Sequence, residues 1–477
     1  MAEPRKPRNL QELIDSAPNL VDYLFRNPKG ALFRFISYAM PSPYVSPEFT
    51  NWRDEQRSWW ESVGLSDQSF HMTNLWVRGP DAFRFLEHLA VNSFQGYAPG
   101  RAKQFIACSP DGYFVGDAVL YYLAPETFVL VGVDTTMNWV QYHAEVGGYE
   151  VRIERDPLFS DNPTGRRTLY RFELEGPKAT PLMEKLVGGP LPEIRFFHFT
   201  DLSIAGCRVW VLRHSMTGSP GFELSGPWED RERVLQAILE AGKEFGLRRV
   251  GSLAYFTNAL ESGWIAGPLP AIYTGDALRP YREWLPVTAP EATGAIGGSF
   301  YSPNIEDYYL TPYDLGYGHI VKFDHDFVGR KSLERLAERP HLQKVTLVWE
   351  AEDVLELVRR SLLLEEGTPA KHLDLPVGMY ARWKYDRVEN GRGERIGISQ
   401  WTGYVANERA VLSLAMVDPA YAEPGTEVVV VWGEDGGGAR SGPWIERHEP
   451  MPVRATVAPV PISRVAREYW AVVKARR

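Results

Sequence analysis

The chain has 477 residues, enough for roughly two or three domains, and its 44% hydrophobic and 24% charged residues are typical of a globular protein. A net charge of −9 without a long basic run argues against nucleic-acid binding. The first residues lack the apolar core of a signal peptide, no apolar run is long enough to span a bilayer, and the two cysteines suit a reducing compartment. We therefore expect a cytoplasmic protein that binds neither nucleic acid nor membrane.

The first 60 residues are rich in aromatic side chains and interrupted by proline, as in FRFISYAMPSPY. This composition predicts an irregular surface segment. We predict an aromatic N-terminal extension over 1–60 that caps the functional cleft or packs against it.

Two later stretches share one plan. LWVRGPDAFRFLEHLAVNSF (75–94) and LYRFELEGPKATPLMEKLVGG (169–189) each predict a strand, a Gly-Pro pair and an amphipathic helix. Proline is tolerated in the first turn of a helix, so Gly79-Pro80 and Gly176-Pro177 would begin those helices. The alternative to a duplication is a chance similarity.

The segments that follow the two stretches also correspond. Strands at 113–123 and 127–133 and a helix opening at Asp134 follow the first, while strands near 196–204 and 206–213 and a helix over 228–246 follow the second. We therefore predict a tandem α+β domain over 61–340, with a cleft between its halves.

Beyond residue 340 the chain consists of short apolar runs separated by Gly, Asn and Asp. The runs are KVTLVW, PVGMYARWKY, IGISQWTGYV, AVLSLAMV and TEVVVVWG. This pattern predicts a separate small β-barrel or sandwich over 341–477. The closing stretch VAPVPISRVAREYWAVVKARR predicts a terminal helix.

Asp117 is the first candidate for a functional residue, because it interrupts the apolar strand predicted from Phe114 to Leu123. A buried carboxylate needs a partner or takes up a proton. Other chemistries lack their motifs: the histidines show no usual metal-ligand spacing, and there is no dinucleotide fingerprint, phosphate loop or G-x-S-x-G elbow. We therefore expect no metal site.

A more specific motif lies at 213–223, where R-x-x-x-T-G-x-x-G-x-E is read from Arg213 to Glu223. This motif resembles the folate-binding domain of the glycine-cleavage T-protein, an aminomethyltransferase. DQSFHMTNLWVRGPDAFRFLEHLAVNS, PGRAKQFIACSPDGYFVGDAVLYYL and LGYGHIVKFDHDFVGRKSL follow the order of that superfamily, and the resemblance covers roughly residues 50 to 430. It implies a duplicated sheet-and-helix folate-binding domain followed by a small C-terminal β-barrel, with tetrahydrofolate as cofactor.

Glu223 suits folate chemistry because a pterin ring offers two adjacent donors, a ring N–H and an exocyclic amine. A carboxylate can accept both in a bidentate pair. Taken alone, Glu223 is better explained as a strand glutamate that faces solvent, and it is the motif that favours the pterin. Asp117 would then reach the folate or the substrate from the other half, or serve as a hydrogen-bonded structural residue, and both interpretations stay open.

Two departures narrow the resemblance. The T-protein carries a pair of acids where this chain has Gly116-Asp117, and its acidic turn is Ser219-Pro220 here. NWRDEQRSWWESVGLSDQSFHM, AKQFIACSPDGYFVGDAVL, NWVQYHAE and ALESGWIAGPLPAIYTGD resemble instead the tetrahydrofolate-dependent aryl O-demethylases. These bacterial enzymes transfer a methyl group from lignin-derived vanillate, 3-O-methylgallate or syringate to tetrahydrofolate, which gives 5-methyltetrahydrofolate.

Two alternatives stay open at this point. One is aminomethyl transfer as in glycine cleavage, which Gly116 and Ser219 disfavour. The other is a non-enzymatic folate-binding protein that assists iron–sulfur cluster assembly, although the K-G-C-Y-x-G-Q-E stretch that marks this class is absent.

The resemblance also implies the roles of single residues. Tyr255 would be the general acid, since the ordinary tyrosine pKa of about 10 matches a phenol leaving group, and His71 would help it beside the substrate. Each is otherwise explained as a core residue. The implied folate-binding residues are Gln104, Asp117, Phe197, Glu223 and Trp264, and the implied substrate residues are His71, Tyr44 and Tyr255.

The preferred substrate is suggested by one position. The vanillate-type enzymes carry an arginine near the position of Val133, whereas LVGVDTT is apolar here. The resemblance therefore favours a doubly methoxylated acid such as syringate, with vanillate and 3-O-methylgallate as alternatives. The sequence leaves the oligomeric state open.

Overall fold

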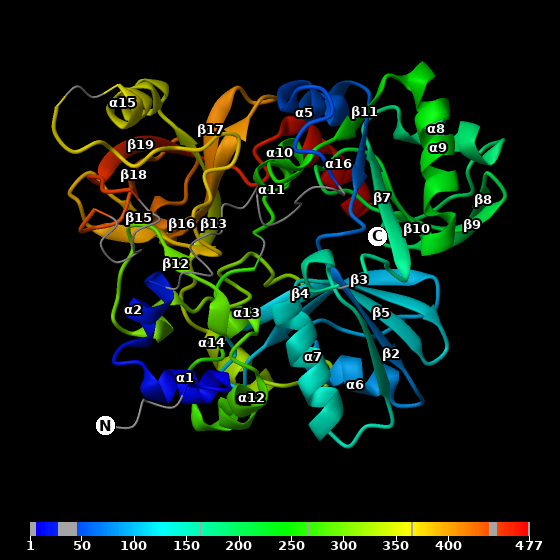
Figure 1. The fold of residues 1–477 in the computed structure, drawn as a ribbon, viewed down its shortest axis with the longest axis horizontal. Helices are drawn as coiled ribbons and strands as arrows, with labels where there is room; N and C mark the ends of the chain where they lie inside the picture. The colour runs from blue at the N-terminus through cyan, green and yellow to red at the C-terminus, as the bar shows by residue number, and fades with distance from the viewer. Residues whose placement is uncertain are drawn as a thin grey trace.

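The computed structural model describes residues 6–26, 45–162, 164–265, 267–363, 366–437 and 446–475, with Ser160 described by its backbone only. Two open sheets and one closed barrel are arranged around a central region (Figure 1). The sheets occupy the right of the view, one above the other, and the barrel lies at the upper left.

The first half of the α+β region is a five-stranded antiparallel sheet in the order β3-β4-β5-β2-β6. Two helices, α6 (Ala82–Leu89) and α7 (Asp134–Val146), pack with it. Its strands are β2 (Thr73–Arg78), β3 (Arg101–Cys108), β4 (Phe114–Ala124), β5 (Thr127–Gly132) and β6 (Arg152–Asp156).

The second half is a six-stranded sheet in the order β11-β1-β7-β10-β9-β8, in which only β1 and β11 pair in parallel. The helices α8 (Ala179–Val187) and α9 (Arg231–Gly242) pack together beside it. Its strands are β1 (Val63–Asp67), β7 (Leu169–Glu175), β8 (Phe199–Ile204), β9 (Cys207–Arg213), β10 (Gly221–Pro227) and β11 (Leu247–Val250).

The duplication predicted from the Gly-Pro pairs is visible in the backbone. Gly79 and Gly176 have φ angles of +138° and +134°, which L-residues with side chains rarely adopt. A Cβ at Gly79 would lie 2.3 Å from the carbonyl oxygen of Glu150, and one at Gly176 would lie 2.5 Å from that of Ser62. The same turn between strand and helix therefore requires glycine in both halves.

The C-terminal region is a closed six-stranded barrel in the order β13-β17-β16-β15-β18-β19. The strands are β13 (Gln343–Trp349), β15 (Asp386–Glu389), β16 (Arg395–Val405), β17 (Ala410–Val417), β18 (Glu427–Trp432) and β19 (Met451–Ala458). Val345, Leu347 and Trp349 alternate along β13 and point into the barrel core. The helix α15 (Ala351–Leu362) follows β13.

One predicted barrel strand was wrong. Within PVGMYARWKY only β14 (Trp383–Lys384) is a strand, and it pairs with β12 (Ile296–Gly297) outside the barrel. Pro376 at the start of this run has no amide hydrogen to donate to a strand ladder. β15 and β19, which the sequence analysis did not identify as strands, complete the barrel instead.

Short helices connect these units. Residues 252–262 form two of them, α10 (Ser252–Tyr255) and α11 (Asn258–Ser262), and α5 (Trp52–Glu61) packs against α10. The terminal helix α16 (Arg464–Ala475) lies centrally, close to both sheets (Figure 1). The remaining α-helices of the described residues are α1 (Leu10–Ser16), α2 (Leu20–Phe25), α12 (Arg279–Trp284), α13 (Pro290–Thr293) and α14 (Arg330–Ala337). Across the described ranges, none of these helices has the length and apolar character needed to cross a membrane.

Candidate active site

A cavity of about 380 Å³ lies where the two sheets, the barrel and α16 meet. This volume falls within the range of typical small-molecule sites. Six of the residues predicted for the site line it: Gln104, Asp117, Phe197, Glu223, Tyr255 and Trp264. They come from both halves of the duplicated region, as the predicted cleft requires.

Asp117 is buried on β4 and has three hydrogen-bond donors around one of its oxygens. Gln104 Nε2 at 2.7 Å, Tyr317 OH at 2.7 Å and Trp264 Nε1 at 3.1 Å all donate to Oδ2. Burial raises the pKa of Asp117, and these three hydrogen bonds counteract that rise. Because all three donors share Oδ2, Oδ1 is left to accept a hydrogen bond from a ligand in the cavity.

Two aromatic side chains frame this end of the cavity. The indole N–H of Trp264 also lies 3.0 Å from the hydroxyl of Tyr317, which fixes the plane of the indole. Phe197 has a φ of +57°, a left-handed conformation that is uncommon for a bulky residue. Its carbonyl accepts from the amide of Ala102 on β3, so this strained backbone joins the two halves at the cavity.

Glu223 on β10 is buried and is held by Arg171 from the neighbouring strand β7. Arg171 donates from Nε to Oε1 at 3.1 Å and from Nη2 to Oε2 at 2.8 Å, and the hydroxyl of Tyr121 donates to Oε1. Burial alone would raise the pKa of Glu223, but the charge of Arg171 outweighs it and holds the pKa below its usual value. A carboxylate has about four acceptor positions, so one remains for a ligand.

The bidentate pair expected between Glu223 and a pterin is thus already formed with Arg171. The strand register explains why. Glu173 on β7 lies directly opposite Glu223, and two like charges at that position repel each other. Arg171, two residues before Glu173 on the same strand, offsets this repulsion.

His214 is a second cation beside the acidic residues Glu173 and Glu223. His214 Nδ1 lies 3.0 Å from Glu173 Oε1, and although burial would lower the pKa of His214, the carboxylate of Glu173 raises it to about 9. Burial and the charge of Glu173 also raise the pKa of Glu175 to about 8. Glu173, His214 and Glu223 present ligand atoms within 4.8 Å of one another. Metal ligands must be deprotonated and available, whereas the His214 imidazole is protonated and the Glu223 carboxylate is paired with Arg171. These side chains therefore suit a network of balanced charges better than a metal site.

Tyr255 and His71 form the pair with the chemistry of proton transfer. The Tyr255 hydroxyl lies 3.1 Å from His71 Nε2, and the two rings meet edge to face with centroids 5.0 Å apart. Burial, reinforced by the charges of Arg171 and Arg167, lowers the pKa of His71 to about 3, so this imidazole is neutral. Burial also raises the pKa of Tyr255, so its hydroxyl stays protonated. The ordinary phenol pKa assumed from the sequence therefore does not apply in this site.

The geometry does not favour the predicted contact between His71 and the substrate. Tyr255 lines the cavity, whereas His71 is not among the described residues that line it, and it packs behind the Tyr255 ring. Nδ1 of His71 is buried and has no hydrogen-bond partner among the described residues. His71 is therefore placed to orient Tyr255. Tyr44, the third predicted substrate residue, lies outside the described residues.

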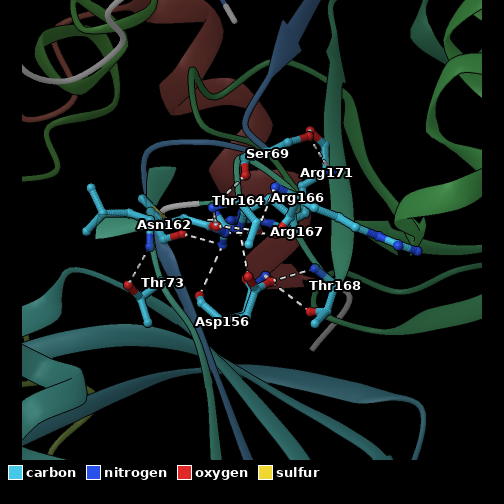
Figure 2. A network of polar contacts seen from close by, with 12 residues as sticks. Ser69, Thr73, Asp156, Asn162, Thr164, Arg166, Arg167, Thr168 and Arg171 are labelled. Carbon is cyan, nitrogen blue, oxygen red and sulfur yellow. Dashed lines mark hydrogen bonds and ion pairs between the residues drawn. The ribbon is translucent and has the colours of Figure 1, made fainter. Parts of the chain in front are cut away.

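The loop that carries His71 is fixed by a buried ion pair (Figure 2). Arg167 Nε lies 2.9 Å from Asp156 Oδ1, and their side chains are only 1% and 3% exposed. The same guanidinium donates to the carbonyl oxygens of Ser69 and Met72, each at 2.8 Å. Because these carbonyls flank His71, Arg167 sets the position of the imidazole relative to Tyr255.

The helix that carries Tyr255 is fixed by a second buried acid. Glu55 on α5 accepts a hydrogen bond from the amide of Gly251, at the start of α10, at 2.8 Å. A Cβ at Gly251 would lie 2.2 Å from the carbonyl oxygen of Pro47. The described end of the N-terminal extension therefore supports the Tyr255 helix from behind.

The helix α16 provides a wall of the cavity that was not predicted from the sequence. Trp470, Val473 and Lys474 line the cavity, and the Trp470 ring meets Phe196 edge to face at 5.1 Å. A Cβ at Gly218, in the predicted glycine turn, would lie 2.3 Å from the Cβ of Ala466, so glycine lets the helix approach this turn. The terminal helix was predicted from its periodicity, but periodicity does not say what a helix covers.

Comparisons with known proteins agree with this architecture. Residues 24–267 match the GCVT N-terminal domain. The chain is 44% identical to the syringate O-demethylase of Sphingobium sp. (strain NBRC 103272 / SYK-6), over 97% of this chain and 98% of that protein. It is 30% identical to the sesamin methylene transferase of Sinomonas sp. (strain No.22), over 76% and 79%. The glycine cleavage aminomethyltransferase T of Bartonella henselae has the same fold, with a TM-score of 0.57 at 18% identity over 87% and 90%.

The chain therefore belongs to the GCVT family, within its tetrahydrofolate-dependent O-demethylase branch. It is accordingly an enzyme, a methyltransferase whose cosubstrate is tetrahydrofolate. The α+β fold with its C-terminal barrel, expected from the sequence, is confirmed.

Proposed function

We propose that this enzyme removes a methyl group from a methoxylated aromatic acid, with syringate favoured and vanillate or 3-O-methylgallate as alternatives. The methyl group passes to N5 of tetrahydrofolate. The observation that carries this proposal is the protonated Tyr255 hydroxyl on the cavity wall, backed by the neutral imidazole of His71. The similarity to a syringate O-demethylase along nearly the whole chain supports the same substrate class.

The reaction replaces one bond to carbon by another. A bond forms between N5 and the methyl carbon while the bond between that carbon and the ether oxygen breaks. N5 releases its proton, and the departing phenolate oxygen takes one up. Because an aryl ether carbon is poorly activated, holding N5 and the methyl group in line and meeting the charge that develops on oxygen supply the catalysis.

Tyr255 would give its proton to the ether oxygen. His71, neutral and with Nε2 protonated, would donate to the Tyr255 oxygen and leave the tyrosine proton directed at the substrate. Arg171 is close enough to oppose the rise in the Tyr255 pKa that burial causes, and it would stabilise the tyrosinate that forms. In this scheme Tyr255 is the catalytic acid and His71 is a positioning residue.

The folate would bind across the two halves of the cavity. Glu223 offers its remaining acceptor position to a pterin donor, and Asp117 offers Oδ1 from the opposite sheet. Trp264 and Phe197 are placed to contact flat rings. Gln104 would hold Asp117 in place, since its amide donates to Oδ2.

The proposal includes the domain division predicted from the sequence: an extension over 1–60, a folate-binding domain over 61–340 and a barrel domain over 341–477. A contribution of Tyr44 to the substrate site is likewise kept. A Tyr44→Phe variant that raises the KM for syringate would support that contribution.

Aminomethyl transfer is the second candidate, and one contact disfavours it. A Cβ at Gly116 would lie 2.2 Å from Thr136 Oγ1, so β4 has no room for the second acid of the T-protein pair. A folate-binding role without catalysis would leave the arrangement of Tyr255 and His71 without a purpose.

The deciding experiment incubates the purified protein with tetrahydrofolate and syringate. The expected products are 3-O-methylgallate and 5-methyltetrahydrofolate in equal amounts, measured by liquid chromatography and mass spectrometry. Parallel rates with vanillate and 3-O-methylgallate rank the substrates. Folate binding without turnover would favour the iron–sulfur accessory role, and turnover only with a lipoyl-bound aminomethyl group would favour the T-protein reaction.

A further inference from the structure

Lys344 is a residue of the barrel whose side chain reaches the cavity. Its neighbours Val345 and Leu347 belong to the barrel core. Lys344 itself lines the cavity, and its ammonium lies 5.9 Å from the centre of the Tyr317 ring. The barrel therefore contributes a cation to a site that the two folate-binding halves otherwise form.

The cations Arg171 and His214 on the same wall already have partners. Arg171 is paired with Glu223, and His214 is paired with Glu173. Among the described residues the ammonium of Lys344 donates no hydrogen bond and forms no ion pair. Asp117 attracts Lys344 without contacting it, and Asp117 Oδ2 is already occupied by three neutral donors.

This leaves a half-buried cation with unused donors. Burial lowers the pKa of Lys344 to about 8, because the protein supplies little to stabilise the charged form. A buried charge without a hydrogen-bonded partner is costly, and an anionic ligand that meets it gains a charge-assisted hydrogen bond.

We propose that Lys344 is the group in the cavity that binds a carboxylate of the ligands. The nature of those ligands rests on the proposed function, which offers two sources of the same chemistry. One is the carboxylate of the aromatic acid, and the other is the glutamyl end of tetrahydrofolate. In either case Lys344 selects for an acid over its neutral counterpart.

The test compares the wild-type enzyme with Lys344→Met, which keeps the chain length and removes the charge, and with Lys344→Arg, which keeps the charge. The ligands are syringate against its methyl ester, and tetrahydrofolate against its dimethyl ester. Loss of one charge-assisted hydrogen bond weakens binding by about 10- to 100-fold. We expect Lys344→Met to lose that factor for one acid and not for its ester, and Lys344→Arg to recover most of it.

The acid whose binding weakens in Lys344→Met, relative to its ester, identifies which carboxylate Lys344 binds. A loss confined to syringate assigns Lys344 to the substrate, and a loss confined to tetrahydrofolate assigns it to the glutamyl end. Equal effects on acids and esters would mean that Lys344 only balances Asp117, and the proposal would be wrong. If the wild-type enzyme demethylates syringate but Lys344→Met affects acids and esters equally, the proposed function stands and the role of Lys344 does not.

Proton uptake gives a readout that does not depend on turnover. A carboxylate bound to Lys344 raises its pKa above about 8, so binding near pH 8.5 takes up a proton. Calorimetry in two buffers of different ionisation enthalpy should detect this uptake in the wild type and not in Lys344→Met.

Lys103 provides the matched control. Burial lowers its pKa to about 8 as well, but its ammonium donates to the carbonyl of Ser93 and it is not a residue of the cavity wall. Lys103→Met should leave both the proton uptake and the preference for acids over esters intact. Loss of either in this variant would count against a specific role for Lys344.

Discussion

The hydroxyl of Tyr255 lies 3.1 Å from Nε2 of His71, with the tyrosine on the cavity wall and the imidazole behind it. The two residues come from α10 and from the loop before β2, and each support is held by its own buried side chain. Glu55 holds the start of α10, and Arg167 holds the loop. Disturbing either support should therefore change catalysis without touching the cavity.

Replacing Tyr255 by phenylalanine removes the proposed proton donor and keeps the ring. We expect kcat to fall by roughly 10²- to 10⁴-fold, which is the usual contribution of a general acid, while the Kd for tetrahydrofolate changes little. Tyr273→Phe is the control, because Tyr273 is equally buried but donates to the carbonyl of Glu291 outside the cavity. Unchanged turnover in Tyr255→Phe would transfer the role of acid to another group.

Replacing Arg167 by methionine leaves Asp156 as a buried charge without its partner and releases the carbonyls that flank His71. Breaking a buried pair in this way costs about 3–5 kcal/mol, and kcat should fall with the loss of stability. The adjacent residue offers the control, since Arg166 pairs with Glu229 at the surface, where both side chains are more than half exposed. Arg166→Met should leave the free energy of unfolding close to that of the wild type, because an exposed ion pair contributes little to stability. Denaturant titration and steady-state kinetics measure both variants.

Asp117→Asn tests the free oxygen of Asp117. The side-chain amide can keep an oxygen at the position that accepts from Gln104, Tyr317 and Trp264, and then an NH₂ group replaces Oδ1. We expect the melting temperature to stay close to that of the wild type and the Kd for tetrahydrofolate to rise by roughly tenfold, the value of one hydrogen bond near 1.4 kcal/mol. Fluorescence or calorimetric titration measures the Kd. Unaltered folate binding would make Asp117 a purely structural residue.

Glu261 gives a pH dependence of stability with a defined sign. Its carboxylate accepts from Trp59 Nε1 and Asn407 Nδ2, and burial raises its pKa to about 8. The pKa of Glu261 in the folded state therefore exceeds the value of about 4.3 in the unfolded state. The stability that protonated Glu261 contributes is complete below about pH 4.3 and is lost as the pH rises through 8. Glu261→Gln stays neutral, so its melting temperature should improve relative to that of the wild type between pH 5 and pH 8. A difference that is constant with pH would contradict the raised pKa.

The sequence predicted the duplicated plan because the signals involved are local. A strand, a glycine at a left-handed turn and an amphipathic helix each leave a pattern within about 20 residues, and both copies of the pattern were found in the fold. Glu223 was likewise predicted on the strand that follows a glycine turn. The predicted cavity-lining residues were identified through the family resemblance. Three of them, Gln104, Asp117 and Glu223, are polar residues within strands, where a local pattern does not reveal a role.

The parts that were missed depend on strand register and on packing between units. Arg171 meets Glu223 only because β7 and β10 are adjacent and in a particular register, which no local pattern encodes. Lys344 reaches the cavity only because the barrel docks beside the two sheets. The position of His71 behind Tyr255 follows from the Arg167 ion pair, in which a residue of the segment between β6 and β7 meets the last residue of β6.

The helix α16 has a practical consequence for anyone who handles this enzyme. Its last described turn carries Val473 and Lys474 on the cavity wall, so a purification tag or fusion partner attached behind it would begin beside the cavity. The first described helix, α1, lies at the far corner of the molecule (Figure 1). An affinity tag belongs there, where it can be left in place during kinetic measurements.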